Sequence, residues 1–223
     1  MRLFVAAYPP APVADDLAGL VATLAVARTA ADGVNTRLVP TATWHITLAF
    51  LGEVPDGRRL EVEAALEAAA ARWRAEHAEP PVVRVQGGGR FGRGRFTILW
   101  AGLAGDVEAL RALATAVRRE LRRARLPCDG KLFRPHLTLA RPGDRVPTGA
   151  VQADVAALRD HTGPAWRVGE LRLMRSHLGP KPSYDQLASW SLDAHTAGEP
   201  ASPSGRPGRA KPAQPGLEHQ PSS

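Results

Sequence analysis

Cysteine is nearly absent from this chain of 223 residues, which has only Cys128. One cysteine cannot form an intramolecular disulfide, so a fold held by internal disulfides is excluded and we expect a reducing compartment, by default the cytoplasm. A lone cysteine is more often a small buried hydrophobic side chain than a nucleophile. A chain of this length can bury a substantial core without covalent staples.

Long apolar runs are also missing. No segment approaches the roughly 18 to 20 consecutive apolar residues that a membrane-spanning helix needs. The short apolar run after Arg2 is interrupted by Pro9, Pro10 and Pro12 before it reaches the length of a signal-peptide core. We therefore expect neither export nor insertion into a membrane.

Lysine is scarce, with 3 lysines against 26 arginines, and basic residues outnumber acidic ones to give a formal charge of +7 and a pI near 10.6. This balance favours anionic partners such as RNA, nucleotides or phosphate esters. Guanidinium groups suit bidentate contact with phosphate. A compositional bias towards arginine would produce the same ratio, however, so charge alone assigns no ligand.

The signatures of several enzyme classes are lacking. No His-x-x-x-His, Cys-x-x-Cys or clustered carboxylate indicates a zinc site, and no Gly-x-Ser-x-Gly turn indicates a serine nucleophile. The glycine-rich stretch 87–95 lacks the Gly-Lys-Ser/Thr ending of a P-loop and no helix directly follows it. We expect a mobile hairpin connection there.

What the chain does contain is one short pattern twice, as His-Ile-Thr-Leu-Ala from His45 and as His-Leu-Thr-Leu-Ala from His136. Side chains alternate between the two faces of a strand, so each histidine shares a face with the threonine two residues later, Thr47 or Thr138. The aliphatic residues between them face a core. The repetition predicts one active site built from two halves.

The surrounding pattern predicts an α+β protein. We expect strands at 2–8, 35–39, 43–51, 82–86, 96–101, 168–177 and 184–192, a further strand at the second motif, and helices at 15–31, 58–76, 106–125 and 151–160. Two motif strands in related surroundings indicate a duplicated, two-lobed domain over residues 1–194, with antiparallel sheets facing a central cleft and helices outside. From His195 the composition changes to Pro, Ser, Gly and charge, which predicts a disordered tail over 195–223.

Two imidazoles on opposite sides of a cleft suit phosphodiester hydrolysis without a metal. One takes a proton from water while the other gives a proton to the departing oxygen, and an ordinary histidine pKa of about 6.5 allows both states near neutral pH. The threonine hydroxyls can donate hydrogen bonds to the non-bridging phosphate oxygens.

Several motifs resemble the 2H phosphoesterase superfamily, and within it the RNA 2′,3′-cyclic phosphodiesterases, also called 2′-5′ RNA ligases. The resemblance is carried by both His-x-Thr motifs, the opening Met-Arg-Leu-Phe-Val-Ala, the Phe-x-Pro-His form of the second motif, and the late Ser-His-Leu-Gly followed by Tyr184. It covers the chain from Met1 to about Asp193. It implies hydrolysis of an RNA 2′,3′-cyclic phosphodiester to a 2′-phosphomonoester.

The resemblance also implies roles for individual residues: His45 is the proton donor and His136 the proton acceptor. Arg141 matches an arginine that follows the second motif and would bind phosphate, whereas Phe50, at the equivalent position of the first copy, suits packing or stacking on a base. Strict alternation would turn Arg141 away from His136, so the strand must bulge or end before it. Tyr184 is expected at the substrate as well. We expect no cofactor, no metal, and a monomer that acts on RNA or a nucleotide with a 2′,3′-cyclic phosphate.

Two alternatives remain open at this point: joining of RNA ends through a 2′-5′ linkage, and a nucleotide- or RNA-binding module without chemistry. Presence of both histidines and both threonines favours catalysis, and the lack of an ATP motif favours hydrolysis over joining. The remaining histidines are predicted to be structural or solvated: His77, His161, His177, His195 and His219. Among them, His177 lies nearest to a predicted turn, the one at Gly179-Pro180-Lys181-Pro182.

Overall fold

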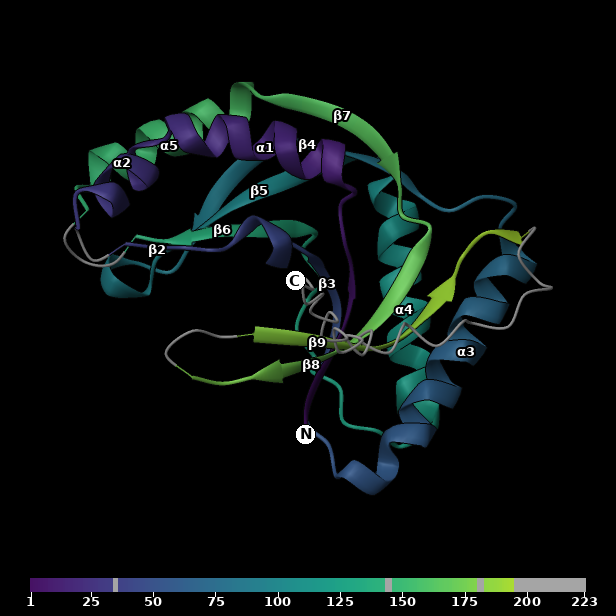
Figure 1. Cartoon of the computed structure of the whole chain (residues 1–223). Helices are drawn as coiled ribbons and strands as arrows, with labels where there is room; N and C mark the ends of the chain where they lie inside the picture. Colours follow the sequence, from purple (N-terminus) through teal and green to yellow (C-terminus); the bar gives the residue numbers. More distant parts are fainter. Residues whose placement is uncertain (34–35, 143–145, 180–182, 195–223) are drawn as a thin grey trace, which may run out of the picture.

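The computed structural model describes residues 1–33, 36–142, 146–179 and 183–194 (Figure 1). The strands are β1 (Arg2–Ala7), β2 (Arg37–Leu38), β3 (Ile46–Glu53), β4 (Val82–Phe91), β5 (Ile98–Gly105), β6 (His136–Arg141), β7 (Thr162–Arg167), β8 (Glu170–His177) and β9 (Ser183–Ser191). The α-helices are α1 (Ala11–Thr23), α2 (Ala25–Ala31), α3 (Arg59–Glu76), α4 (Val107–Arg123) and α5 (Thr148–Asp160). The predicted tail, 195–223, lies outside the described residues.

The strands form two antiparallel sheets. One has four strands in the order β3-β1-β8-β9, and the other has five in the order β2-β6-β5-β4-β7. Each sheet contains one motif strand, β3 in the first and β6 in the second. The sheets are not halves of the sequence, because the last two strands, β8 and β9, return to pair beside β1.

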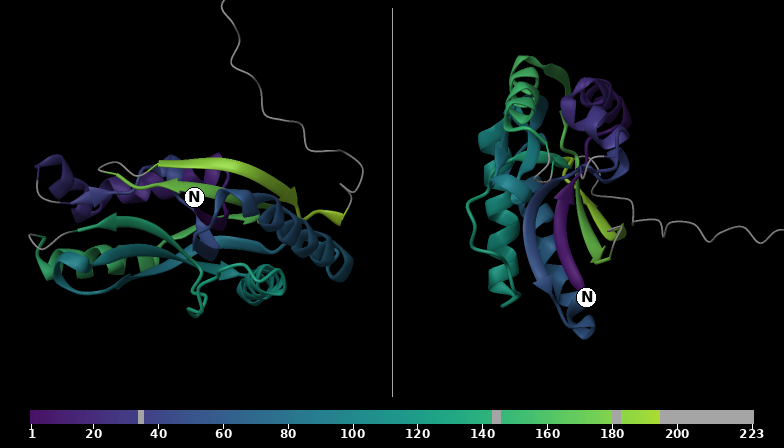
Figure 2. Two further views of the ribbon diagram at one scale, coloured as in Figure 1. Left: turned by 90° about the horizontal axis from the view of Figure 1, so that it is seen from below. Right: turned by 90° about the vertical axis from the view of Figure 1, so that its left-hand side faces the viewer.

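The helices gather in two groups that cover the sheets (Figure 1). Helices α1, α2 and α5 accompany the five-stranded sheet, where α1 packs on β7 and α5 packs on β4, whereas α3 and α4 pack together beside the four-stranded sheet. Viewed from below, the strands of the two sheets lie in separate layers (Figure 2). The expected α+β architecture of two facing antiparallel sheets with outer helices is confirmed.

The inner aliphatic residues of both motif strands are completely enclosed. Ile46, Leu48, Leu137 and Leu139 are at most 1% exposed and belong to one continuous core. Burial of such a side chain contributes on the order of 1.5–3 kcal/mol relative to its exposure. The alternation predicted from the sequence thus anchors each motif strand from its aliphatic side.

The glycine-rich segment differs from the expectation of a hairpin connection. Gly87, Gly88 and Gly89 lie inside β4, which continues to Phe91, and the hairpin turn comes later. A Cβ on Gly88 would meet Leu158 of α5 at 2.5 Å, and one on Gly89 would meet the Trp100 ring at 2.4 Å. The glycines therefore allow close packing on both faces of a strand.

Other elements differ in their limits. The helix predicted over 15–31 begins at Ala11 and is broken at Leu24, whose extended backbone separates α1 from α2. Strand β7 was not predicted, because glycine and proline within Thr162–Arg167 obscure its pattern. The second strand is only Arg37–Leu38, and the predicted start of that strand at Asn35 lies outside the described residues.

Among the helices of the described residues, none has the length and apolar character required to cross a membrane.

Candidate active site

A cleft of about 380 Å³ lies between the two motif strands, within the size range of small-molecule sites. Both sheets contribute to its walls, and the repeated motif supplies four of the lining residues. The cleft is lined by Arg2, Phe4, Arg37, Leu38, Val39, Pro40, Thr43, His45, Thr47, Phe50, His136, Thr138, Arg141, Ser176, Leu178 and Tyr184. The structure thus brings together every site residue predicted from the sequence.

The two histidines are held by the same backbone contact. His45 Nδ1 lies 2.7 Å from the carbonyl oxygen of Thr43, and His136 Nδ1 lies 2.6 Å from that of Arg134. A carbonyl oxygen only accepts, so Nδ1 carries the hydrogen and donates it in both rings. Nε2 is therefore the nitrogen left for the cleft, basic when the imidazole is neutral and acidic when it is protonated.

The threonine hydroxyls are available to a ligand. Thr47 and Thr138 both line the cleft, and within the described ranges neither side chain has a hydrogen bond to another protein group. Each is two residues beyond its histidine, on the same face of the strand. A half-buried hydroxyl without a protein partner is suited to donate to an anion in the cleft.

Each motif strand contains a β-bulge just after its threonine. In β3, Ala49 and Thr47 pair with consecutive residues of β1, so Leu48 between them has no partner. In β6, Ala140 and Thr138 pair with consecutive residues of β5, so Leu139 has no partner. The extra residue reverses the alternation beyond it, so that Phe50 and Arg141 return to the cleft side. The bulge that Arg141 required is present, and the first copy shares it.

Aromatic rings surround His45. Its ring centroid lies 4.9 Å from that of Phe4 and 5.5 Å from those of Tyr8 and Tyr184, and the Tyr184 ring is perpendicular to it. Burial and the neighbouring Tyr184 phenol raise the pKa of Tyr8 to about 12, against the opposing charge of Arg172. Tyr8 therefore keeps its proton, and its ring lies uncharged beside the imidazole of His45.

Fewer rings contact His136. Phe91 approaches it edge-on at 5.0 Å, and Trp100 lies 6.1 Å away. Burial lowers the pKa of both catalytic candidates, His45 and His136, and their backbone hydrogen bonds oppose this shift. The charge of His136 lowers the pKa of His45 further. In the free protein, both imidazoles therefore favour the neutral state near neutral pH.

The arginines that line the cleft give it a positive charge. Arg2, Arg37 and Arg141 line it, and its described lining contains no aspartate or glutamate. The guanidinium of Arg2 lies 4.8 Å over the Phe50 ring, so cation and aromatic face form one surface. The sequence reasoning missed Arg2, Arg37 and Phe4. The alternation of Arg2 and Phe4 along β1 could have indicated their common face, whereas Arg37 has no such signal.

Comparison with known proteins connects this geometry to a family. The family model of the 2′-5′ RNA ligase superfamily matches residues 12–180. An RNA 2′,3′-cyclic phosphodiesterase of Thermus thermophilus is 32% identical over 210 residues, which cover 86% of this chain and 90% of that protein. The chain belongs to the 2′-5′ RNA ligase superfamily. The resemblance noted in the sequence is thereby confirmed.

Further comparisons agree with this assignment or show the same fold. An RNA 2′,3′-cyclic phosphodiesterase of Geobacillus stearothermophilus is 31% identical over 163 residues, 69% of this chain, but the match spans only 49% of that relative. The crystal structure of TT0787 from Thermus thermophilus superposes with a TM-score of 0.62 at 30% identity, over 87% of this chain and 100% of the other. E. coli LigT complexed with 3′-AMP has a TM-score of 0.61 at 24% identity, over 86% of this chain and 98% of that one, which shows a shared fold.

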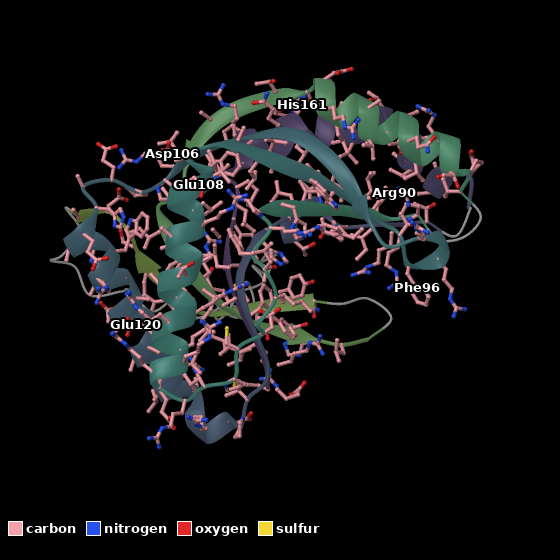
Figure 3. The ribbon with its side chains drawn as sticks, turned by 180° about the vertical axis from the view of Figure 1, so that it is seen from behind. Arg90, Phe96, Asp106, Glu108, Glu120 and His161 are labelled. Atoms are coloured by element: carbon pink, nitrogen blue, oxygen red, sulfur yellow. The ribbon has the colours of Figure 1, made fainter. Side chains whose placement is uncertain are left out.

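The other described histidines lie outside the superfamily's cleft. His177 Nε2 is 2.6 Å from Asp185 across the β8–β9 hairpin, and His161 Nε2 lies 3.0 Å from a carboxylate oxygen of Asp16. Figure 3 shows His161 near the junction of α5 and β7, on the outer side of the larger sheet. His77 stacks on Trp73 at 3.7 Å. Structural or solvated roles thus stay a prediction for these three histidines, which are absent from the cleft lining, and His195 and His219 lie outside the described residues.

Proposed function

We propose that this chain hydrolyses RNA 2′,3′-cyclic phosphodiesters to 2′-phosphomonoesters by general acid-base catalysis with two histidines. The observation that carries the proposal is the matched pair of imidazoles, each fixed through Nδ1 and each accompanied by a free threonine hydroxyl in a basic cleft. Three relatives of the chain bear the name RNA 2′,3′-cyclic phosphodiesterase. That name supports the proposed substrate class and reaction type.

In this reaction Nε2 of His136 accepts a proton from water as the water oxygen attacks phosphorus. Nε2 of His45 donates a proton to the 3′ oxygen as the bond between that oxygen and phosphorus breaks. The assignment of donor and acceptor follows the family resemblance, because the two backbone-anchored rings have equivalent geometry. The phosphate remains on the 2′ oxygen, and each histidine must exchange its proton before the next turnover.

Charge concentrates on the non-bridging oxygens during the attack. Thr47 and Thr138 would donate hydrogen bonds to these oxygens, and Arg141 would pair with the anion after the bulge turns it inward. Phe50 and Tyr184 would position the nucleoside by contact with its ring surfaces. Among the described residues no group of three His, Cys, Asp or Glu side chains could hold a metal ion, so the proposal uses protein groups alone.

The proposal is tested with a short RNA that ends in a 2′,3′-cyclic phosphate, with the position of the product phosphate determined by NMR or by chromatography against both isomers. We expect the 2′-phosphomonoester, with turnover unchanged after dialysis against EDTA. A 3′-phosphate product would contradict the assigned leaving oxygen. Activity lost in EDTA and restored by zinc or manganese would contradict the metal-free mechanism.

A further inference from the structure

The edge of the larger sheet places two positive charges directly opposite each other. Arg37 on β2 is the register partner of Arg141 on β6, and both side chains are exposed. Like charges at directly opposed positions destabilise a strand pair. Within the described residues, neither guanidinium has an ion pair or a hydrogen bond to a protein acceptor. Nothing described in the fold itself offsets this repulsion.

This arrangement contrasts with that of four arginines on the helical surface. Arg58, Arg59, Arg72 and Arg111 are each paired with a glutamate three or four residues along their own helical segment. The two opposed arginines instead line the cleft, which contributes no described carboxylate. Other described surface arginines, such as Arg159, also lack a protein partner, but only here do two of them meet in register at the cleft. This convergence makes the cleft suited to an anion from outside the chain.

The pair lies away from the histidines. Arg141 is five residues beyond His136 on β6, a separation on the order of 16 Å along an extended strand before the bulge shortens it. Arg37 lies directly opposite Arg141 on β2, the edge strand, one strand to the side of the one that contains His136. Arg141 can reach back towards the phosphorus held between the histidines, whereas Arg37 is placed for a second anion.

We propose that Arg37 binds the phosphate on the 5′ oxygen of the nucleoside that carries the cyclic phosphate, while Arg141 opposite it pairs with the cyclic phosphate itself. In an RNA chain this group is the nearest anion to the cyclic end, since only the neutral ribose separates them. The guanidinium fork of Arg37 can bind its oxygens through charge-assisted hydrogen bonds. The inference rests on the proposed hydrolysis and specifies its substrate: a cyclic end that bears a 5′-phosphate, as in RNA of two or more nucleotides, is preferred to a bare nucleoside 2′,3′-cyclic phosphate.

Three substrates test this inference: a nucleoside 2′,3′-cyclic phosphate, the same compound with a 5′-phosphate, and a dinucleotide that ends in the cyclic phosphate. We expect kcat/KM of the parent protein to rise about tenfold when the 5′-phosphate is present in either form, the order expected for one charge-assisted hydrogen bond. Arg37→Gln should remove most of that preference. The ratio between substrates is the readout, since it cancels a general loss of activity.

A matched control is Arg159→Gln, which removes the same charge from an exposed position of α5, the helix that packs on β4 away from the cleft lining. It should keep the full preference for a 5′-phosphate. Arg37→Lys should keep part of it, because the charge remains but the planar fork is lost. Arg37→Gln should also reduce the slope of log kcat/KM for the dinucleotide against log salt by about 0.7, the value for one lost contact with a single-strand phosphate.

The outcomes separate the two proposals. A parent protein that hydrolyses none of the three substrates overturns the proposed function, and the inference with it. Equal kcat/KM for all three, or an Arg37→Gln variant with the parent's preference, overturns the inference alone. A gain from the dinucleotide but none from the 5′-phosphorylated nucleoside would assign the preference to the added nucleoside, which also overturns it.

Discussion

The two motif strands use one backbone arrangement in two different surroundings. His45 directly precedes β3 and His136 opens β6. In both copies Nδ1 of the histidine donates to the carbonyl two residues earlier, and a bulge follows the threonine. These shared features fix the positions of the two imidazoles and hydroxyls. They are local, so each copy of the motif specifies them within its own few residues.

The side chains around each motif differ. His45 lies among Phe4, Tyr8 and Tyr184, whereas His136 contacts Phe91 and Trp100. After the bulge, the first copy presents Phe50 and the second presents Arg141. A symmetric substrate site would be indifferent to orientation. Under the proposed function, the aromatic side and the basic side would favour one direction of substrate binding, and the two imidazoles would then have different tasks.

Removal of either imidazole should have the largest effect. We expect His45→Ala and His136→Ala each to lower kcat by about 10² to 10⁴, the usual contribution of a general acid or base. A similar loss from both would show that the two halves contribute equally to the chemistry. Steady-state kinetics with the cyclic-phosphate RNA measures this.

His177→Ala is the matched control, because His177 pairs with Asp185 at the surface and is absent from the cleft lining. Its turnover should stay close to that of the parent. Circular dichroism and thermal unfolding should show that all three variants fold. Near-parental activity in either motif variant would contradict the two-histidine mechanism.

Removal of the hydroxyls should have a smaller effect. Thr47→Val and Thr138→Val keep the β-branched shape but delete the donor, so kcat should fall by roughly 10- to 1000-fold, at or below the cost of a lost oxyanion donor. Thr47→Ser and Thr138→Ser keep a donor and should recover part of the loss. Valine variants as fast as the parent would show that the threonines were retained for strand structure. Unequal losses would show which lobe binds the more strongly charged oxygen.

The local features of this fold could be predicted from the sequence. Alternation placed His45 with Thr47 and His136 with Thr138, and the same rule required the strand to bulge or end before Arg141; the structure contains the bulge. These inferences depend on a few neighbouring residues. They succeed because the period of a strand is independent of what the strand pairs with.

Features that depend on pairing could not be predicted in this way. The position of Arg37 in the cleft follows from its pairing with β6, which is distant in sequence. From the sequence, the glycines of β4 indicated a loop. Their packing against Leu158 and Trp100 is visible only in the folded structure, because it depends on other elements of the chain. Local periodicity likewise does not indicate that β8 and β9 pair in the first sheet, because that pairing is set by tertiary contacts.

The smallest expected effect is a displacement of the pH profile, and it tests the environments of the two imidazoles together. Burial lowers the pKa of both His45 and His136, so a proton needed on one of them is lost at lower pH than from an exposed histidine. The dependence of kcat/KM reports the free protein, and we expect a bell with its maximum below about pH 6.5, the ordinary histidine pKa. A bound phosphodiester anion favours the protonated imidazole, so the bell of kcat should lie at higher pH than that of kcat/KM.

Measurement of both parameters across about pH 4.5 to 9 brackets these ionisations, whose limbs belong to the coupled pair and not to either residue. Thr47→Val should lower the bell without moving it far, since the hydroxyl carries no charge. A kcat/KM maximum well above pH 7, or a bell of kcat at lower pH than that of kcat/KM, would contradict the desolvated environment that the structure gives the two rings. A profile without limbs under conditions where chemistry limits the rate would contradict proton transfer by the pair.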